Sequence, residues 1–241
     1  MPHKKVSEKK IKFIDLFAWI WGFHLAFHNL WAECVFASEW DEAARKTYEH
    51  NLKEISSDLF NTGNFVWDIT KVDEKNIPNF NVLCAWFPCQ PFSQAGFKKG
   101  FSETRWTLFF DIVRILREKK PEAFFLENVR HLLKHDDWKT FATIKRVLEE
   151  ELGYSFFYKI VKASDFWLPQ HRPRLFMVGF LDKSIDFKFP EPFDLKMTMS
   201  DIWWWNCEKK IGFTLRVGWK WSKIDDRRNW DAYMVNGQIK K

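Results

Sequence analysis

The sequence has few glycine residues. It contains 9 glycines in 241 residues, whereas average usage would give about 17 in a chain of this length. Tryptophan is in excess, with 15 residues against 4 tyrosines. Because the tryptophans fall where loops need glycine, we expect the shortage and the excess to have one cause.

Long apolar runs and cysteine pairs are also missing. No stretch reaches the ~18 uninterrupted apolar residues of a membrane span, and the lysine-rich segment 1–12 precedes no small-residue cleavage site. The four cysteines form no Cys-x-x-Cys pair, which argues against a disulfide scaffold and a zinc cage. With 46% hydrophobic residues the chain can bury a full core, so disorder is excluded. We expect a soluble, cytoplasmic protein with reduced thiols.

Positive charge is concentrated towards the C-terminal end. The net charge is +6; residues 196–241 hold ten Lys and Arg against five Asp and Glu, whereas residues 1–195 hold 28 against 27. Tryptophans alternate with these basic residues, as expected where phosphate contacts and base stacking occur together. The pattern favours a nucleic acid as partner, and a solvated lysine-rich surface is the alternative. The basic residues concerned are Arg216, Lys220, Lys223, Arg227 and Arg228.

Short apolar runs alternate with amphipathic segments along most of the chain. Alternating strands and helices of these lengths predict an α/β fold with a doubly wound, mostly parallel sheet. A domain boundary is expected near the Pro-rich segment 189–192, which separates a domain of residues 1–190 from residues 191–241. The expected strands are 11–17, 34–39, 82–86, 123–126, 154–161 and 175–180, and the expected helices lie at 23–30, 41–52, 107–119 and 141–152, the last ending at Gly153.

Polar residues collect at the carboxyl ends of the expected strands. Glu39, Asp68, Cys89 and the pair 127–128 all lie there, and this edge is where open parallel sheets bind ligands. Segment 17–22 occupies the first strand-to-helix turn, a typical cradle for nucleotide-like ligands, and Glu39 is placed to accept hydrogen bonds from ribose hydroxyls. The alternative is an aromatic turn packed on the core with a helix-capping acid.

Cys89 stands in a proline-bracketed loop, Phe-Pro-Cys-Gln-Pro, after an expected buried strand. That setting suits a nucleophile, whereas Cys34 and Cys84 are interpreted as small buried hydrophobes. Glu127 ends the next strand, where apolar walls would hold its carboxyl protonated; an ion-paired acid is the alternative.

Segment 170–174, Gln-His-Arg-Pro-Arg, offers two guanidinium groups in a rigid frame. Such groups suit carbonyl oxygens or phosphates, and a surface basic loop is the alternative. His24 with His28, and His131 with His135, have metal-compatible spacing but no third ligand, so we expect no metal.

Five motifs together resemble the cytosine-5 DNA methyltransferases of bacterial restriction-modification systems. They are the turn at 17–22, the acid–Trp pair at 39–40, Pro-Cys-Gln at 88–90, Glu-Asn-Val at 127–129 and Gln-x-Arg-x-Arg at 170–174. The resemblance covers roughly residues 13–192. It implies a Rossmann-like S-adenosylmethionine-dependent methyltransferase sheet, followed after residue 190 by a linker and the start of a small target-recognition domain.

The resemblance also assigns roles to individual residues. Cys89 matches the nucleophile that attacks carbon 6 of a flipped-out cytosine, Glu127 the acid at ring nitrogen 3, and Arg172 and Arg174 the residues that position the base. The S-adenosylmethionine-binding residues it implies are Phe17, Ala18, Trp19, Ile20, Gly22, Glu39, Trp40, Asp68, Ile69, Pro88 and Leu108. The DNA-binding residues are Gln90, Ser93, Lys98, Lys99, Gln170, Arg216, Lys220, Arg227 and Arg228. Double-stranded DNA and a cognate restriction endonuclease are the implied partners of a monomer.

The chain departs from the family in two respects. Tryptophan stands at nine positions where the family has glycine: 19, 21, 31, 67, 86, 106, 138, 167 and 219. Our hypothesis is that these are UGA codons, which some bacterial lineages read as glycine. The rest of the recognition domain does not follow Lys241, which leads us to expect a C-terminally truncated chain.

Three other functions remain open at this point. A non-catalytic DNA-binding remnant is consistent with the tryptophans and the short chain. A nucleotide-dependent oxidoreductase would share the sheet but leave Pro-Cys-Gln and Glu-Asn-Val unexplained. A related methyltransferase that acts on transfer RNA shares most motifs, and the basic segment argues against it.

Overall fold

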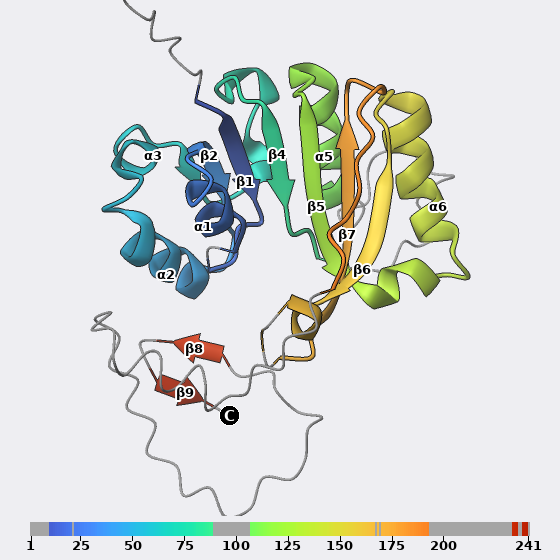
Figure 1. Cartoon of the computed structure of the whole chain (residues 1–241). Coiled ribbons are helices and arrows are strands. Elements are labelled where there is room, and N and C mark those ends of the chain that lie inside the picture. The colour runs from blue at the N-terminus through green and yellow to red at the C-terminus, as the bar shows by residue number, and fades with distance from the viewer. Residues whose placement is uncertain are drawn as a thin grey trace, which may run out of the picture.

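Seven strands form one sheet in the computed structural model, which describes residues 10–20, 22–88, 107–166, 168, 170–192, 233–235 and 238–240. Their order across the sheet is β3-β2-β1-β4-β5-β7-β6 (Figure 1). Two further strands, β8 (Tyr233–Val235) and β9 (Gln238–Lys240), pair antiparallel with each other. The strands of the large sheet are β1 (Lys12–Leu16), β2 (Glu33–Ser38), β3 (Phe65–Val66), β4 (Val82–Ala85), β5 (Ala123–Val129), β6 (Phe157–Lys162) and β7 (Pro173–Phe180).

The sheet is mostly parallel, as the sequence predicts. Strands β1 to β5 pair in parallel, whereas β7 lies antiparallel between β5 and β6. The chain runs outward from β1 to β3 and then returns to place β4 on the other side of β1. The carboxyl ends of β1 and β4 therefore flank the point where the strand order reverses, which is where sheets of this kind bind ligands.

Both faces of the sheet are buried because apolar residues alternate along its strands. On β1, Phe13 joins one cluster, whereas Ile14 and Leu16 join the other. Helices α1 (Gly22–His28), α2 (Glu42–Leu52) and α3 (Ser57–Asn61) contribute to the first cluster. Helices α5 (Thr107–Lys119) and α6 (Lys139–Arg146) cover the second. Figure 1 shows α5 beside β5 and α6 beside β6.

Short helical turns make up much of the rest of the domain. They are η1 (Ile69–Lys71), η2 (Glu74–Asn76), η3 (Arg130–Lys134), η4 (Val147–Glu151) and η5 (Ala163–Phe166). The π-helical turn η4 continues α6, and Gly153 follows it with a φ of 79°. This positive φ, which glycine adopts freely, confirms the expected end of the helix at Gly153.

Several boundaries differ from the sequence prediction. Strand β5 continues to Val129 and β7 begins at Pro173, because the antiparallel pairing extends to Val129 opposite Arg174. Glu127 and Arg174 therefore lie within strands rather than in the loops beside them. Strand β6 begins at Phe157 instead of residue 154, because its pairing with β7 begins at Phe157 opposite Val178. Helix α1 ends at His28, two residues before the expected Leu30.

Helix α3 has no counterpart in the prediction, because five residues are too short for a periodic signal. Strand β3 ends two residues before Asp68, which the sequence placed at the end of a strand without giving that strand's bounds. Cys34 and Cys84 are buried free thiols, as expected. Among the described residues, no helix has both the length and the apolar character needed to cross a bilayer.

Candidate active site

The turn after β1 is fastened to the end of β2. The Ala18 N–H donates to the Ser38 carbonyl (2.9 Å), and the Trp19 N–H donates to Oε2 of Glu39 (2.7 Å). The other oxygen of Glu39 accepts from the Asp41 N–H (2.8 Å). Phe17 and Trp19 have φ values of 55° and 50°, in the left-handed region that favours glycine.

Glu39 is a buried carboxylate at the carboxyl end of β2. Burial raises its pKa above the ordinary value, and the N–H groups of Asp41 and Trp19 oppose that shift. With both oxygens already accepting one hydrogen bond, further lone pairs remain for hydroxyl donors. The geometry is compatible with the expected contact to ribose hydroxyls.

Two exposed indoles follow β2 and β3. The rings of Trp40 and Trp67 lie 5.5 Å apart between centroids, and Nε1 of Trp67 donates to the Trp40 carbonyl (2.7 Å). Asp68 follows directly and caps η1 by accepting from the Thr70 N–H (3.1 Å). Ile69 is buried beneath it. Trp40, Trp67 and Asp68 therefore lie at the carboxyl ends of the neighbouring strands β2 and β3, next to Glu39.

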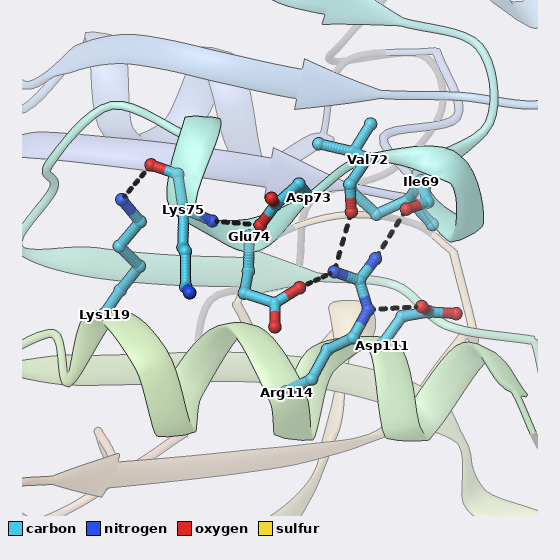
Figure 2. Close-up of polar contacts among 8 residues, drawn as sticks. All are labelled: Ile69, Val72, Asp73, Glu74, Lys75, Asp111, Arg114 and Lys119. Carbon is cyan, nitrogen blue, oxygen red and sulfur yellow. Dashed lines mark hydrogen bonds and ion pairs between the residues drawn. The ribbon is translucent and has the colours of Figure 1, made fainter. Parts of the chain in front are cut away.

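Arg114 on α5 holds the segment that carries Asp68 and Ile69 (Figure 2). Its Nη2 donates to the Ile69 carbonyl (2.6 Å) and its Nη1 to the Val72 carbonyl (2.8 Å). It also forms ion pairs with Glu74 (2.5 Å) and Asp111 (2.8 Å). Sequence reasoning missed this residue, because the two carbonyls that it binds lie more than forty positions away on a loop without a motif.

The expected acid at the end of β5 is buried and ion-paired. Oε1 of Glu127 lies 3.0 Å from Nε of Arg174 on β7. Burial raises the pKa of Glu127 to about 7, although the positive charges of Arg174 and Arg172 act in the opposite direction. Its Oε2 is buried and has no hydrogen-bond partner of ordinary geometry among the described residues. Both interpretations from the sequence, the protonated acid and the ion-paired acid, therefore describe part of its environment.

Asn128, the neighbour of Glu127, fixes the loop that leads to Cys89. Its buried side chain donates to the Phe87 carbonyl (2.8 Å) and accepts from the Val129 N–H (2.8 Å). The backbone two residues before Cys89 is thereby tied to β5. The sequence pointed to the Glu-Asn pair, but not to this role of Asn128.

Two further indoles contact each other between the turn after β1 and Arg172. The rings of Trp19 and Trp86 make an edge-to-face contact at 5.8 Å between centroids. The Arg172 guanidinium carbon lies 5.5 Å from the centre of the Trp86 ring. The structure thus joins the turn after β1 to Arg172 through two tryptophan side chains.

The remaining expected site residues vary in their placement. Leu108 is half-buried on α5, Ala18 is buried, and Ile20 is half-buried in the turn after β1. Gly22 begins α1, whereas Pro88 and Gln170 are exposed. The expected residues Cys89, Gln90, Ser93, Lys98, Lys99, Arg216, Lys220, Arg227 and Arg228 lie outside the described residues.

Two of the histidines form side-chain hydrogen bonds in the part of the chain that the structure describes. His24 is buried between the Tyr48 hydroxyl (2.6 Å) and the Ser56 hydroxyl (2.8 Å). Nδ1 of His135 lies 2.7 Å from the Thr140 hydroxyl. These contacts tie His24 to α2 and to the segment before α3, and His135 to α6.

Comparison with known proteins places this arrangement in a family. The family model of the C-5 cytosine-specific DNA methylases matches residues 11–215. The type II methyltransferase M.SsoII of Shigella sonnei is 48% identical over 206 residues, which cover 83% of this chain and 52% of that protein. M.HhaI of Haemophilus parahaemolyticus is 45% identical over 194 residues, with 80% and 56% covered.

Solved structures agree with the fold. A triple mutant of DNMT2 from Spodoptera frugiperda superposes with a TM-score of 0.57 at 21% identity, covering 78% of this chain and 55% of the other. The chain spans about half the length of the curated relatives named above. On the family match and the identity to its relatives, the chain belongs to the C-5 cytosine-specific DNA methylases.

Proposed function

We propose that this chain forms the catalytic part of a DNA (cytosine-5) methyltransferase of a restriction-modification system. The enzyme would transfer a methyl group from S-adenosylmethionine to carbon 5 of a flipped-out cytosine in double-stranded DNA. The observation that carries the proposal is the buried Glu127, whose pKa is raised to about 7 beside Arg174. The division into a catalytic domain of residues 1–190 and a recognition segment from residue 191 belongs to the proposal.

The cofactor side of the site fits S-adenosylmethionine in part. Glu39 suits ribose hydroxyls, and Trp40 with Asp68 and Ile69 offers an aromatic face and a polar edge next to it. The indoles of Trp19 and Trp86 do not fit, since their contact lies between that side and Glu127. S-adenosylmethionine, when bound, supplies the methyl group.

Glu127 performs the proton step at the base. A carboxyl with a pKa near 7 is partly protonated at neutral pH, so it would donate a hydrogen bond and then a proton to ring nitrogen 3. The proton at nitrogen 3 neutralises the negative charge that develops on the ring when a thiolate adds at carbon 6, and so lowers the cost of that addition. Cys89 is the proposed thiolate, and after transfer it leaves as carbon 5 loses its proton.

The two arginines hold the base and the acid. Arg174 keeps the Glu127 carboxyl in one orientation through the 3.0 Å ion pair. Arg172 lies on the same side and lowers the pKa of Glu127, as Arg174 does, which keeps the carboxyl able to release its proton again. Both guanidinium groups suit the carbonyl oxygen of cytosine or a flanking phosphate.

The proposed partners follow from the reaction. We propose double-stranded DNA as the substrate, a cognate restriction endonuclease as the partner, and a monomeric enzyme in the cytoplasm. The DNA contacts are proposed for Gln90, Ser93, Lys98, Lys99 and Gln170, and for the basic residues of segment 216–228.

Methylation of DNA tests the proposal directly. Two forms of the chain are compared, the unaltered chain and a form with glycine at positions 19 and 86. Each is incubated with S-adenosylmethionine and mixed-sequence DNA, and the nucleosides are analysed by mass spectrometry. We expect 5-methylcytosine with the glycine form, none with its Cys89→Ser variant and at least tenfold less with its Glu127→Gln variant. DNA binding without 5-methylcytosine in either form would instead support the non-catalytic remnant, which the contact between Trp19 and Trp86 favours for the chain as it stands.

A further inference from the structure

Asp15 on β1 holds a carboxyl group in the interior of the fold, and no step of the proposed reaction uses it. Only 1% of the residue is exposed. Burial, and then the charge of Asp15, raise the pKa of the Cys34 and Cys84 thiols, so the carboxyl lies close to thiols on both neighbouring strands, β2 and β4. Its Oδ1 is buried and has no hydrogen-bond partner of ordinary geometry among the described residues. A negative charge here would be poorly compensated.

The same carboxyl is one end of a chain of side-chain hydrogen bonds. The Tyr48 hydroxyl donates to Oδ2 of Asp15 (3.4 Å) and lies 2.6 Å from Nδ1 of His24, and Nε2 of His24 lies 2.8 Å from the Ser56 hydroxyl. Burial, and then the charge of His28, lower the pKa of His24 to about 4, so the ring is neutral at pH 7. Because Tyr48 has one proton and donates it to Asp15, Nδ1 of His24 donates to Tyr48 and Nε2 accepts from Ser56.

This chain connects the two ends of the turn after β1. Asp15 lies two residues before Phe17, and the backbone N–H of His24, in the first turn of α1, acts on the Asp15 carboxyl as a hydrogen-bond donor. Between these two points, the Trp19 N–H donates to Glu39 (2.7 Å). The turn is therefore held at both ends by the Asp15 chain and in its middle by Glu39.

The groups around Asp15 favour its protonated form. Burial raises the pKa of Asp15 well above the ordinary value of 3.8; the Tyr48 hydroxyl and the His24 N–H oppose this shift, and the charge of Glu39 adds to it. No lysine or arginine is among these groups, and His24 is neutral. A charge on Asp15 would also repel the Glu39 carboxylate that holds the turn.

We propose that Asp15 is a positioning residue that works as a neutral acid, and that with Tyr48 and His24 it holds the turn after β1 in place. A neutral carboxyl needs no counter-charge in this interior, whereas a carboxylate would be a buried charge without a cation. The role in holding the turn concerns the fold alone. Its consequence for a bound ligand rests on the proposed function, because the turn is part of the proposed cofactor site.

Chemical denaturation of the full chain from pH 4 to 8 tests the neutral acid. Asparagine has the shape of a neutral carboxyl and does not titrate. Since the folded state holds the Asp15 proton more tightly than the unfolded chain, the unfolding constant of the unaltered chain should rise relative to that of Asp15→Asn, by about tenfold per pH unit until Asp15 ionises. Asp58→Asn, an exposed position in the first turn of α3, is the matched control and should show no such trend. A ratio that stays constant or falls with pH would overturn the neutral acid.

Hydrogen exchange of Tyr48→Phe tests the positioning role. Loss of the hydroxyl breaks the chain between His24 and Asp15, so the N–H groups of residues 18 and 19 should exchange at least about fivefold faster, with exchange in β5 unchanged. Tyr154→Phe is the matched control, because it also removes a buried tyrosine hydroxyl, one that donates to the Pro121 carbonyl (2.8 Å). Unaltered exchange at residues 18 and 19 in Tyr48→Phe, or equal acceleration in both variants, would overturn the role.

Calorimetry with S-adenosylmethionine separates this inference from the proposed function. In the form with glycine at positions 19 and 86, we expect Tyr48→Phe to weaken binding by about fivefold and Tyr154→Phe to leave it unchanged. If that form does not bind while Tyr48→Phe accelerates exchange in the turn, the positioning role stands and the proposed function fails. If that form binds and Tyr48→Phe changes neither affinity nor exchange, the positioning role fails and the proposed function stands.

Discussion

Glu127 on β5 and Arg174 on β7 form an ion pair of 3.0 Å across the antiparallel part of the sheet. The pairing brings a cation to a carboxyl whose pKa nevertheless stays raised, to about 7, because burial outweighs the charge. Such a group exchanges a proton near neutral pH. The antiparallel strand β7 therefore brings Arg174 beside the Glu127 carboxyl, the acid group of the site.

The contribution of Glu127 to the stability of the protein should fall as pH rises from about 4.5 to 7. Since the folded state binds the Glu127 proton more tightly than the unfolded chain does, folding is favoured most below the ordinary pKa of 4.5 and least above 7. Glu127→Gln should remove this part of the pH dependence, worth up to about 3 kcal/mol. Chemical denaturation from pH 4 to 8 measures it, with exposed Glu118→Gln as control. An unchanged profile in Glu127→Gln would show that its pKa is not raised.

Removing the cation should raise the pKa of Glu127 further. In Arg174→Gln the carboxyl loses the charge that most opposes its protonation. We expect the fall in stability to shift to higher pH than in the unaltered chain. Lys145→Gln, on the surface of α6, is the control and should leave the profile in place. A shift to lower pH in Arg174→Gln would contradict the assignment.

Asn128→Ala should destabilise the protein by about 1–3 kcal/mol, because the Phe87 carbonyl and the Val129 N–H both lose a buried partner. Asn51→Ala, which removes a single bond within α2, should change stability by less than about 0.5 kcal/mol. Denaturant unfolding compares the two. Equal effects would mean that the Asn128 side chain does not hold the loop before Cys89.

Arg114→Lys should loosen segment 69–76 without unfolding the sheet. Lysine keeps the charge but lacks the planar fork that reaches the Ile69 and Val72 carbonyls together. We expect faster hydrogen exchange in this segment and unchanged exchange in β5. Arg117→Lys, on the exposed side of α5, is the matched control. Unaltered exchange at 69–76 would exclude Arg114 as the residue that positions Asp68.

The sequence predicts the long elements and the chemical character of the site, but not the contacts between distant segments. Strong periodicity marks α5, and runs of strand-forming residues mark β1, β4 and β5. The acids at 39 and 127 follow from their positions at strand ends. Arg114 has no such signal, since it binds backbone carbonyls that only the folded loop presents. The contact between Trp19 and Trp86 likewise depends on the adjacency of β1 and β4.

The codons of the gene provide an independent prediction. If tryptophan stands at positions built for glycine, codons 19, 31, 86 and 138 should be UGA, a codon that some bacterial lineages read as glycine. Codon 40 should be UGG, because Trp40 belongs to the acid–Trp pair at 39–40 that matches the family. Sequencing the gene settles the matter, and UGG at codons 19, 31 and 138 would rule out this origin of the strained backbone.

The central proposal is that the Cys89 thiolate adds to carbon 6 of a flipped cytosine while Glu127 donates a proton to ring nitrogen 3, and a trapping experiment tests it most directly. DNA that carries 5-fluorocytosine blocks the final loss from carbon 5, so a covalent complex that survives denaturation should accumulate with S-adenosylmethionine. With glycine at the nine tryptophan positions named above, the account predicts an adduct that Cys89→Ser abolishes and Glu127→Gln slows at least tenfold. No adduct in that form, or an adduct that persists in Cys89→Ser, would contradict it.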